Sequence, residues 1–249
     1  MRASARTIAI AIAIWSTSTC APIWKTSPSA CVTAFPPKPS PEPTAKEPPV
    51  ANQNHNLPRL LAQLRQPITD ANEAAAEAAA IALGELGAEA LPAIGELIAS
   101  PDIDHRFWGV RALWANGSPA AQKTLIACLS DAEELIRSVA ALALGELRAE
   151  GAIGALARLL REDASVAGQH AADALAKIGL PAAEALIAAL SDARAWVRLR
   201  AARALVPIES KAAIRPLIHL LDNDESYLVR HYADEALKRM GVGQMIYFK

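Results

Sequence analysis

The pair Ala-Leu recurs through this chain at an almost constant interval. One set of these pairs has its leucines at positions 83, 113, 144, 175, 205 and 237, so that successive leucines of the set lie 30 to 32 residues apart. An interval of this length matches one helical hairpin, and a chain that repeats the hairpin buries the apolar face of each unit only against its neighbours. The period therefore predicts an all-α solenoid of about six hairpins over residues 57–241, a class of fold that usually binds other molecules and rarely catalyses.

The composition supports closely packed helices and argues against nucleic acid as a partner. Hydrophobic residues make up 52% of the chain but aromatic residues only 4%, because most of the apolar content is alanine and leucine. Small side chains let helix backbones approach one another. The net charge is −1, whereas a protein that neutralises many phosphates carries a basic excess.

The first 34 residues have the order of a secretory signal peptide. Arg2 and Arg6 precede an apolar stretch over residues 8–15, which is shorter than the roughly 20 residues needed to cross a bilayer. We therefore expect an exported protein of the periplasm or cell envelope. The alternative is an apolar tail on a cytoplasmic protein. Cleavage after Ala34 or near Ser18 is compatible with the sequence, and Cys20 follows a poor lipoprotein box, so lipidation of Cys20 stays open as a membrane attachment.

Residues 35–56 are rich in proline and predict a spacer. They include the run Phe-Pro-Pro-Lys-Pro-Ser-Pro-Glu-Pro, which favours extended polyproline conformations and cannot bury a core. Residues 242–249 form a short tail after the last hairpin. Beyond Cys20 and Cys31, the remaining cysteine, Cys128, lies within an expected helix, so no disulfide framework or Cys-x-x-Cys metal site is present in the sequence.

Alignment on the leucine divides each unit into two helices. The first helices are expected near residues 57–66, 88–100, 120–130, 152–162, 181–191 and 212–222, and each second helix follows after a turn that contains Asp. A glycine stands four residues past the leucine at Gly87, Gly117, Gly179 and Gly241, where it can end a helix with positive φ. Arg148 and Glu209 take this place in the third and fifth units.

An aspartate and an arginine recur at fixed distances from the leucine. The aspartates lie 11 to 13 residues before it, and the arginines lie seven residues before it. The aspartates are Asp70, Asp102, Asp131, Asp163, Asp192 and Asp224, and the arginines are Arg106, Arg137, Arg198 and Arg230. With the period, these motifs resemble HEAT repeats of the short bacterial type named after phycobilisome lyases. The resemblance implies a right-handed α-solenoid in which an Asp–Arg ladder links adjacent units.

The resemblance also implies that the second helices line a concave face. Residues two, five and six before the leucine would then point into the groove, together with Trp114, which follows the second leucine. The candidates for partner binding are Phe107, Trp108, Arg111, Trp114, Arg200, Arg203, His231 and Tyr232. Aromatic residues beside arginine are typical of protein-binding hot spots.

Each of these candidates has a structural interpretation beside the functional one. Trp108 and Trp114 fill a gap next to Gly109 if they are packing residues. Arg194, Arg200 and Arg203 either form a solvated basic face or bind an acidic peptide, a phosphate or an anionic lipid head.

Enzymatic alternatives find little support in the residues. His231 stands where a deoxyhypusine-hydroxylase-like protein has a metal-binding histidine, but Tyr232 replaces the following glutamate and the equivalent positions in other units lack histidine. We therefore expect no metal, no other cofactor and no catalytic residue. The sequence favours a non-catalytic scaffold that binds a protein or peptide, and the alternative is a phycobilin lyase or a related chaperone of phycobiliproteins.

Overall fold

The computed structural model describes residues 56–67, 69 and 71–242 of the 249-residue chain. The expected leader, Cys20, the spacer up to residue 55, Asp70 and residues 243–249 lie outside the described residues. The described part contains twelve α-helices and no strand. The expected all-helical fold is confirmed.

The helices alternate between a first and a second member of each hairpin, and we number the hairpins as repeats 1 to 6. The first helices are α2 (Leu57–Leu64), α4 (Leu91–Ile98), α6 (Pro119–Cys128), α8 (Ile153–Glu162), α10 (Ala183–Ala189) and α12 (Ile214–Asn223). The second helices are α3 (Glu73–Glu85), α5 (Ile103–Asn116), α7 (Glu134–Glu146), α9 (Val166–Ile178), α11 (Ala195–Leu205) and α13 (Tyr227–Arg239).

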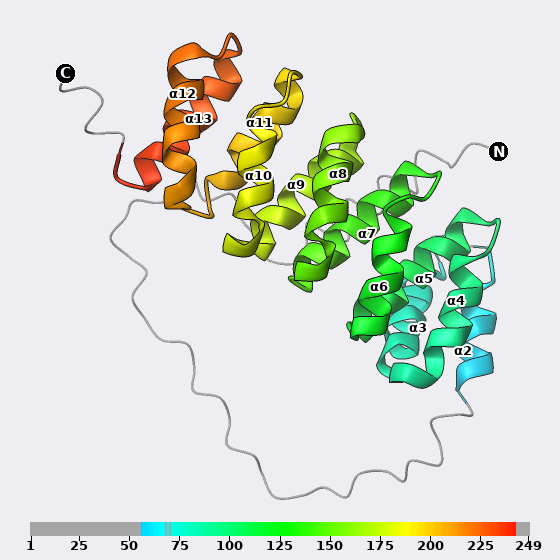
Figure 1. The fold of residues 1–249 in the computed structure, drawn as a ribbon. Helices are drawn as coiled ribbons and strands as arrows, with labels where there is room; N and C mark the ends of the chain where they lie inside the picture. The colour runs from blue at the N-terminus through cyan, green and yellow to red at the C-terminus, as the bar shows by residue number, and fades with distance from the viewer. Residues whose placement is uncertain (1–55, 68, 70, 243–249) are drawn as a thin grey trace, which may run out of the picture. The chain divides into compact units, whose positions relative to one another are not determined.

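These helices form two layers that follow the order of the sequence (Figure 1). Each second helix packs against the second helix of the next repeat and against its own first helix, and contacts between repeats further apart are few. This nearest-neighbour packing is the property that defines a solenoid.

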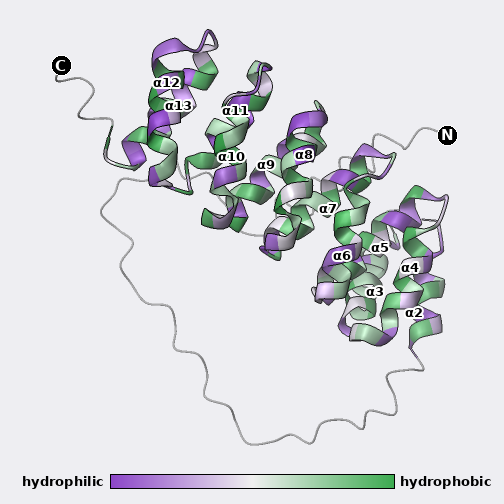
Figure 2. Ribbon diagram, viewed as in Figure 1, coloured by the Kyte–Doolittle hydropathy of each residue, from purple (hydrophilic) through white to green (hydrophobic). Residues whose placement is uncertain are grey.

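The recurring leucine is the centre of each repeat. All six leucines are almost fully buried, and the alanines around them are buried as well. Apolar residues line the packed sides of the helices, whereas hydrophilic residues gather at loops that join the two helices of a repeat (Figure 2). Burial at a helical spacing accounts for the dominance of Ala and Leu in the sequence.

The helix ends follow the predicted glycine rule, including its two exceptions. Gly117 ends α5 with φ 62°, and Gly179 ends α9 with φ 86°. Arg148 and Glu209, which replace glycine at this place, also have positive φ, 47° and 54°. The fold therefore imposes a positive φ on the position regardless of the residue, and a side chain with a Cβ is strained there.

Glycine directly after the leucine allows the closest approach between repeats. A Cβ on Gly145 of α7 would stand 2.7 Å from the Cα of Ala174 on α9, and a Cβ on Gly84 of α3 would stand 2.4 Å from the carbonyl oxygen of Ala112 on α5. At the α5–α7 junction the same position holds Trp114, and the two helices there are less closely packed.

No single helix within the described residues is long and apolar enough to cross a membrane. Two consecutive helical segments, Glu73–Glu85 and Gly87–Ile98, are together long and apolar enough to cross a membrane, judged by length and composition only. The two segments are bent by 118° relative to each other.

Candidate functional site

The aspartates and arginines of the turns form a chain of contacts between repeats. The Nε of Arg106 donates to Asp131 at 3.0 Å, that of Arg137 to Asp163 at 2.8 Å, and that of Arg198 to Asp224 at 2.6 Å. Each aspartate belongs to the repeat after its arginine. These ion pairs are largely buried, so the predicted ladder residues hold the repeats together and are not free for a ligand.

Each arginine of the ladder also binds its own turn. The Nη1 of Arg137 donates to the carbonyls of Asp131 and Ala132, both at 2.9 Å. The carboxylate of Asp131 accepts the backbone N–H of Glu133 two residues later. Similar bonds occur around Arg106, Arg198 and Arg230. The turn carbonyls thus obtain a charged donor, which satisfies polar groups at the helix ends.

Hydrogen bonding sets the acidity of the paired carboxylates. The bond from Arg198 lowers the pKa of Asp224 below its usual value, with a further contribution from the backbone N–H of Ser226. For Asp163, partial burial raises the pKa, but hydrogen bonds from Ser165 and Arg137 outweigh it and the net shift is downward. Both groups are carboxylates at neutral pH.

The ladder is interrupted in repeat 4, where Gly168 stands in the place of the arginine. Asp192 of repeat 5 binds Arg194 of its own turn instead, through Nε and Nη2 at 2.9 Å. This hydrogen bonding lowers the pKa of Asp192 to about 2.

Arg200 replaces the missing arginine from the following repeat. Its side chain reaches back from α11, donating through Nη1 to the carbonyl of Asp163 at 2.7 Å and through Nη2 to that of Ser165 at 2.7 Å. Arg200 is only 8% exposed. The expectation that it points into a binding groove is therefore wrong, because its donors bind the backbone of repeat 4.

Phe107 and Trp108 are also buried, which corrects their expected exposure. They are 7% and 2% exposed and pack edge to face, with ring centroids 5.0 Å apart. Positions five and six before the leucine are covered in repeats 2 and 3 and are accessible only in some of the others. For this pair the packing interpretation holds.

Arg111 and Trp114 lie at the edge of the same cluster and contact each other. The guanidinium of Arg111 sits 4.4 Å from the centroid of the Trp114 ring and forms an ion pair with Glu77 of repeat 1. Both side chains are partly accessible, but the charge of Arg111 is already neutralised.

The remaining candidates lie on the second helices of repeats 5 and 6, where solvent reaches them. Arg203 forms an ion pair with Asp173 of repeat 4. His231 is exposed, stacks on Tyr227 at 6.3 Å between ring centroids, and meets Tyr232 edge to face at 5.3 Å. These aromatic rings form a patch on α13.

The structure shows a row of apolar side chains at a position that the sequence analysis did not assign to the groove. Near the first turns of α7, α9, α11 and α13, position nine before the leucine holds Leu135, Val166, Trp196 and Leu228. Val166 and Leu228 are 53% and 51% exposed, and Leu135 and Trp196 are half-buried. We call these four residues the apolar row. The signal was present in the alignment, since position nine lies two helical turns before position two and on the same face.

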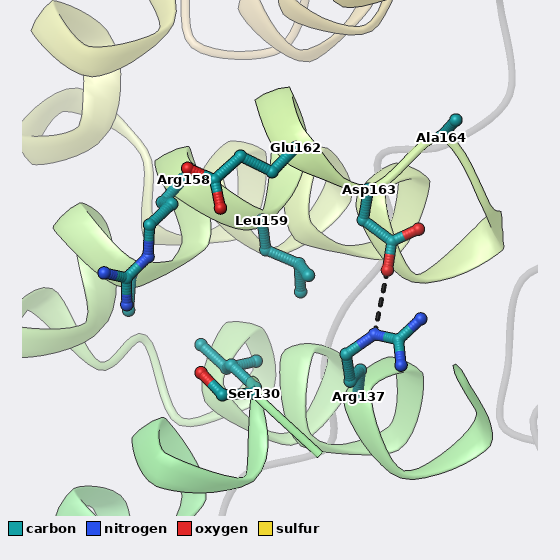
Figure 3. A pocket seen from close by; sticks show the side chains of 9 residues that line it. Ser130, Arg137, Arg158, Leu159, Glu162, Asp163 and Ala164 are labelled. Carbon is teal, nitrogen blue, oxygen red and sulfur yellow. Dashed lines mark hydrogen bonds and ion pairs between the residues drawn. The ribbon is translucent and has the colours of Figure 1, made fainter. Parts of the chain in front are cut away.

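A shallow pocket of about 460 Å³ lies between repeats 3 and 4, on the side of the turns. The Arg137–Asp163 pair lies at one end of it, and Arg158 and Glu162 project from α8 at the other (Figure 3). The two ladder residues among its lining, Arg137 and Asp163, are bound to each other.

Chemically reactive groups do not converge in the described part of the chain. It contains no group of three or more His, Cys, Asp or Glu side chains arranged to hold a metal ion. Burial raises the pKa of Cys128 to about 11, so that its sulfur is a thiol at neutral pH. Burial also lowers the pKa of His170, which keeps that imidazole neutral at pH 7.

Comparison with known proteins identifies the repeat type. The family of HEAT repeats matches residues 91–176 and 162–238. A phycobilisome maturation protein of Synechococcus elongatus is 37% identical over 109 residues, which are 44% of this chain and 52% of that protein. The chain thus spans about half the length of this curated relative.

Two solved structures illustrate the likeness in fold. The complex of CpcE and CpcF of phycocyanin lyase from a Nostoc species is 24% identical, with 86% of this chain and 82% of that chain covered and a TM-score of 0.44. A designed armadillo repeat protein in complex with the peptide (KR)4 is 20% identical, with 74% and 99% covered and a TM-score of 0.46.

Proposed function

This chain belongs to the family of HEAT repeats, and from this premise we propose that it is a non-catalytic scaffold that binds a protein or peptide partner. The partner lies along the solvent-exposed side of the second helices α9, α11 and α13, which the resemblance to HEAT repeats assigns to the concave face of the solenoid. The observation that carries the proposal is the exposure of large apolar side chains on this face. Val166, Tyr227 and Leu228 are each more than half exposed, and Trp196 lies between two of them in chain order.

The polar surroundings of this face also favour binding. Ion pairs join neighbouring second helices, with Asp173 bound to Arg203 and Glu146 to Lys177. The buried Arg198–Asp224 pair fixes repeat 5 against repeat 6, so the face is preorganised and a partner loses less free energy in ordering it. Exposed apolar patches rimmed by polar residues are typical of interaction surfaces.

Site-specific photo-cross-linking tests the location. A photoreactive amino acid replaces Leu228 on the proposed face or Lys123, an exposed residue of α6 in the other layer. We expect a discrete cross-linked species from position 228 in the native cells and none from position 123. Equal cross-linking at the two positions, or cross-linking only at 123, would contradict the proposal.

A second candidate is a role in phycobiliprotein maturation, including attachment of the bilin. It rests on the 37% identical relative, which is a phycobilisome maturation protein. Co-expression of this chain with a phycobiliprotein subunit and a bilin tests it. Covalent pigment on the subunit would establish lyase activity, and a stable colourless complex would make the subunit the client of the scaffold. The absence of both pigment and complex would exclude this candidate.

We also propose that residues 1–34 direct export, on the basis of Arg2, Arg6 and the apolar stretch after them. Mass spectrometry of the N-terminus of the protein from the native cell envelope tests this. A start near residue 35 supports cleavage there, a lipid-modified Cys20 supports anchoring, and an intact Met1 contradicts export.

A further inference from the structure

We propose that Arg230, the ladder arginine of the last repeat, is a binding site for an aspartate of a partner protein. Arg230 stands seven residues before the recurring leucine, as do Arg106, Arg137 and Arg198. Each of those three arginines binds an aspartate of the repeat that follows it. Within the described residues no hairpin follows repeat 6, so the ladder ends there with an arginine and without its aspartate.

The guanidinium of Arg230 is held by its own turn in the same way as the internal ladder arginines. Its Nη1 donates to the carbonyls of Asp224 at 2.5 Å and of Glu225 at 3.2 Å. The Nη1 of Arg198 donates to the two equivalent carbonyls of its turn, both at 2.9 Å. The turn therefore positions the guanidinium before a ligand arrives, and such preorganisation lowers the cost of binding.

The side of the guanidinium that binds aspartate is open in Arg230. In Arg106, Arg137 and Arg198 the Nε donates to an aspartate Oδ2, at 3.0, 2.8 and 2.6 Å. Among the residues that the structure describes, neither Nε nor Nη2 of Arg230 has a hydrogen-bond or ion-pair partner. A carboxylate that arrives here can therefore form the charge-assisted bond that the internal arginines form.

The internal aspartates specify which carboxylate fits this site. In each of them Oδ2 accepts the arginine, while Oδ1 accepts the backbone N–H of the residue two positions later, which is the N-cap of the second helix. The pairs of aspartate and N-cap are Asp131 and Glu133, Asp163 and Ser165, and Asp224 and Ser226. The ligand that fits is thus an aspartate two residues before a helix N-cap, with Oδ2 turned towards Arg230.

Tyr227 offers an aromatic contact beside this carboxylate site. It lies one turn before Arg230 on α13 and is 71% exposed. The equivalent residue of repeat 3 is Glu134, whose carboxylate accepts the backbone N–H of Val166 in the next repeat at 3.2 Å. The position therefore faces the next repeat, and in repeat 6 it holds an uncovered ring. An aromatic ring beside an arginine is typical of binding hot spots.

Leu221, in the last turn of α12, is an apolar side chain at the same end of repeat 6. It is half-buried, whereas the equivalent leucines of repeats 3 to 5 are no more than 4% exposed. These leucines are Leu129, Leu160 and Leu190. Leu129 and Arg137 line one pocket between repeats 3 and 4, and Leu221 and Arg230 are the equivalent pair in repeat 6. A partner whose aspartate binds Arg230 can therefore also bury apolar surface.

The far end of α13 favours a short segment over a further whole repeat, including one from a second copy of this chain. Lys238 stands directly after the recurring leucine, where Gly84 and Gly145 allow the closest approach between repeats. It forms an ion pair with Asp234, which a helix packed along all of α13 would have to bury at a cost. Residues 243–249 contain no Asp or Glu, so they supply no side-chain carboxylate.

Selection of displayed 16-residue peptides on the full chain tests the inference. Peptides that bind Arg230→Gln equally well are removed, so those that are kept depend on Arg230. We expect them to share an Asp, followed two residues later by a helix-capping residue such as Ser or Asn. Replacing this Asp by Asn should weaken binding to the unaltered chain about tenfold, but should change the residual binding to Arg230→Gln little. Arg215→Gln is the matched control, because Arg215 is exposed at the other end of α12, and the tenfold effect should persist there.

The substitution in the peptide leaves the protein unaltered, so it stays informative even if Arg230→Gln is less stable. Arg230-dependent peptides without an acidic residue would overturn the inference, as would an Asp-to-Asn effect of equal size in Arg230→Gln or a failure to recover any Arg230-dependent peptide. Self-association of the chain in sedimentation velocity that is lost in Arg230→Gln would also overturn it, because the occupant would then be a second copy. The inference does not rest on the proposed function, which cross-linking from position 228 decides separately.

Discussion

The guanidinium of Arg200 fills the space that Gly168 leaves open. A Cβ at position 168 would stand 2.5 Å from Nη1 of Arg200 and 2.1 Å from the carbonyl oxygen of Asp163. In the other turns with a ladder arginine, that arginine comes from the same repeat, whereas here it comes from the next one. The glycine and the arginine are therefore one structural unit shared between repeats 4 and 5.

Replacement of Arg200 by methionine should strongly destabilise the solenoid. It removes the charged donor from the carbonyls of Asp163, Ala164 and Ser165, and a buried group left unsatisfied costs about 1–3 kcal/mol. We expect the free energy of unfolding, measured in urea, to fall by about 2–4 kcal/mol. Arg203→Met is the matched control, because its ion pair is more than a third exposed and should contribute less than about 1 kcal/mol. Equal effects of the two substitutions would contradict the role of Arg200.

The period predicted the helices well because helix position depends on local pattern. Gly117 and Gly179 end helices where the alignment placed them, and the leucines occupy the core. Accessibility was predicted less well. The rule that residues five and six before the leucine face a groove treats all repeats as equal, but Phe107 in repeat 2 is buried, whereas His231 at the same position in repeat 6 is exposed.

The role of Arg200 could have been inferred in part. When the six repeats are aligned on the leucine, position 168 holds glycine where other repeats have the ladder arginine. The carbonyl groups of that turn therefore need a hydrogen-bond donor from elsewhere. The direction from which that donor comes depends on how α11 is placed against repeat 4, which a single sequence does not reveal. The spacing of Arg200 from the leucine alone predicts a place on the binding surface, which the structure contradicts.

Glycine at position 148 or 209 should stabilise the protein. Arg148 and Glu209 have φ of 47° and 54°, and a left-handed conformation is unfavourable for a residue with a Cβ by about 1–2 kcal/mol. The greater freedom of glycine in the unfolded chain offsets part of this gain, which leaves about 0.5–1 kcal/mol for Arg148→Gly in urea or thermal unfolding. Gly179 has a φ of 86° and no atom near an added Cβ, so Gly179→Ala should destabilise the protein through backbone strain alone. A loss of stability on Arg148→Gly would contradict the strain.

Acid should remove the stabilisation that the hydrogen-bonded aspartates Asp224 and Asp192 contribute, at a lower pH than the one at which ordinary exposed carboxylates are protonated. The pKa of Asp224 is lowered by its hydrogen bond with Arg198, and that of Asp192 is about 2. Because these values lie below the unfolded value near 3.8, the unfolded state takes up protons first as the pH falls. The stabilisation is thus complete above about pH 4 and is lost towards pH 2.

The variant Asp224→Asn isolates this effect. The Asp224 side chain is 1% exposed, so the free energy of unfolding of the variant at pH 7 should be lower than that of the unaltered protein by about 1–3 kcal/mol. Between pH 4 and pH 2, the free energy of unfolding of the variant should depend less steeply on pH. Urea unfolding at several pH values measures both. Glu96→Gln removes an exposed ion pair with Arg65 and should leave the slope unchanged. An unaltered slope in Asp224→Asn would show that other groups govern the acid response.

Two glycine-to-alanine substitutions should have opposite effects because only one glycine lies at a helix contact. A Cβ on Gly145 would stand 2.7 Å from the Cα and 2.9 Å from the Cβ of Ala174, so α7 and α9 must separate to admit it. Overpacking of this kind typically costs about 1–3 kcal/mol. Gly95 lies inside α4 with no atom near its added Cβ, and Gly95→Ala should stabilise the helix by up to about 1 kcal/mol. Urea unfolding of both variants checks the prediction, and a stabilised Gly145→Ala would mean that the α7–α9 junction is not set by this close approach.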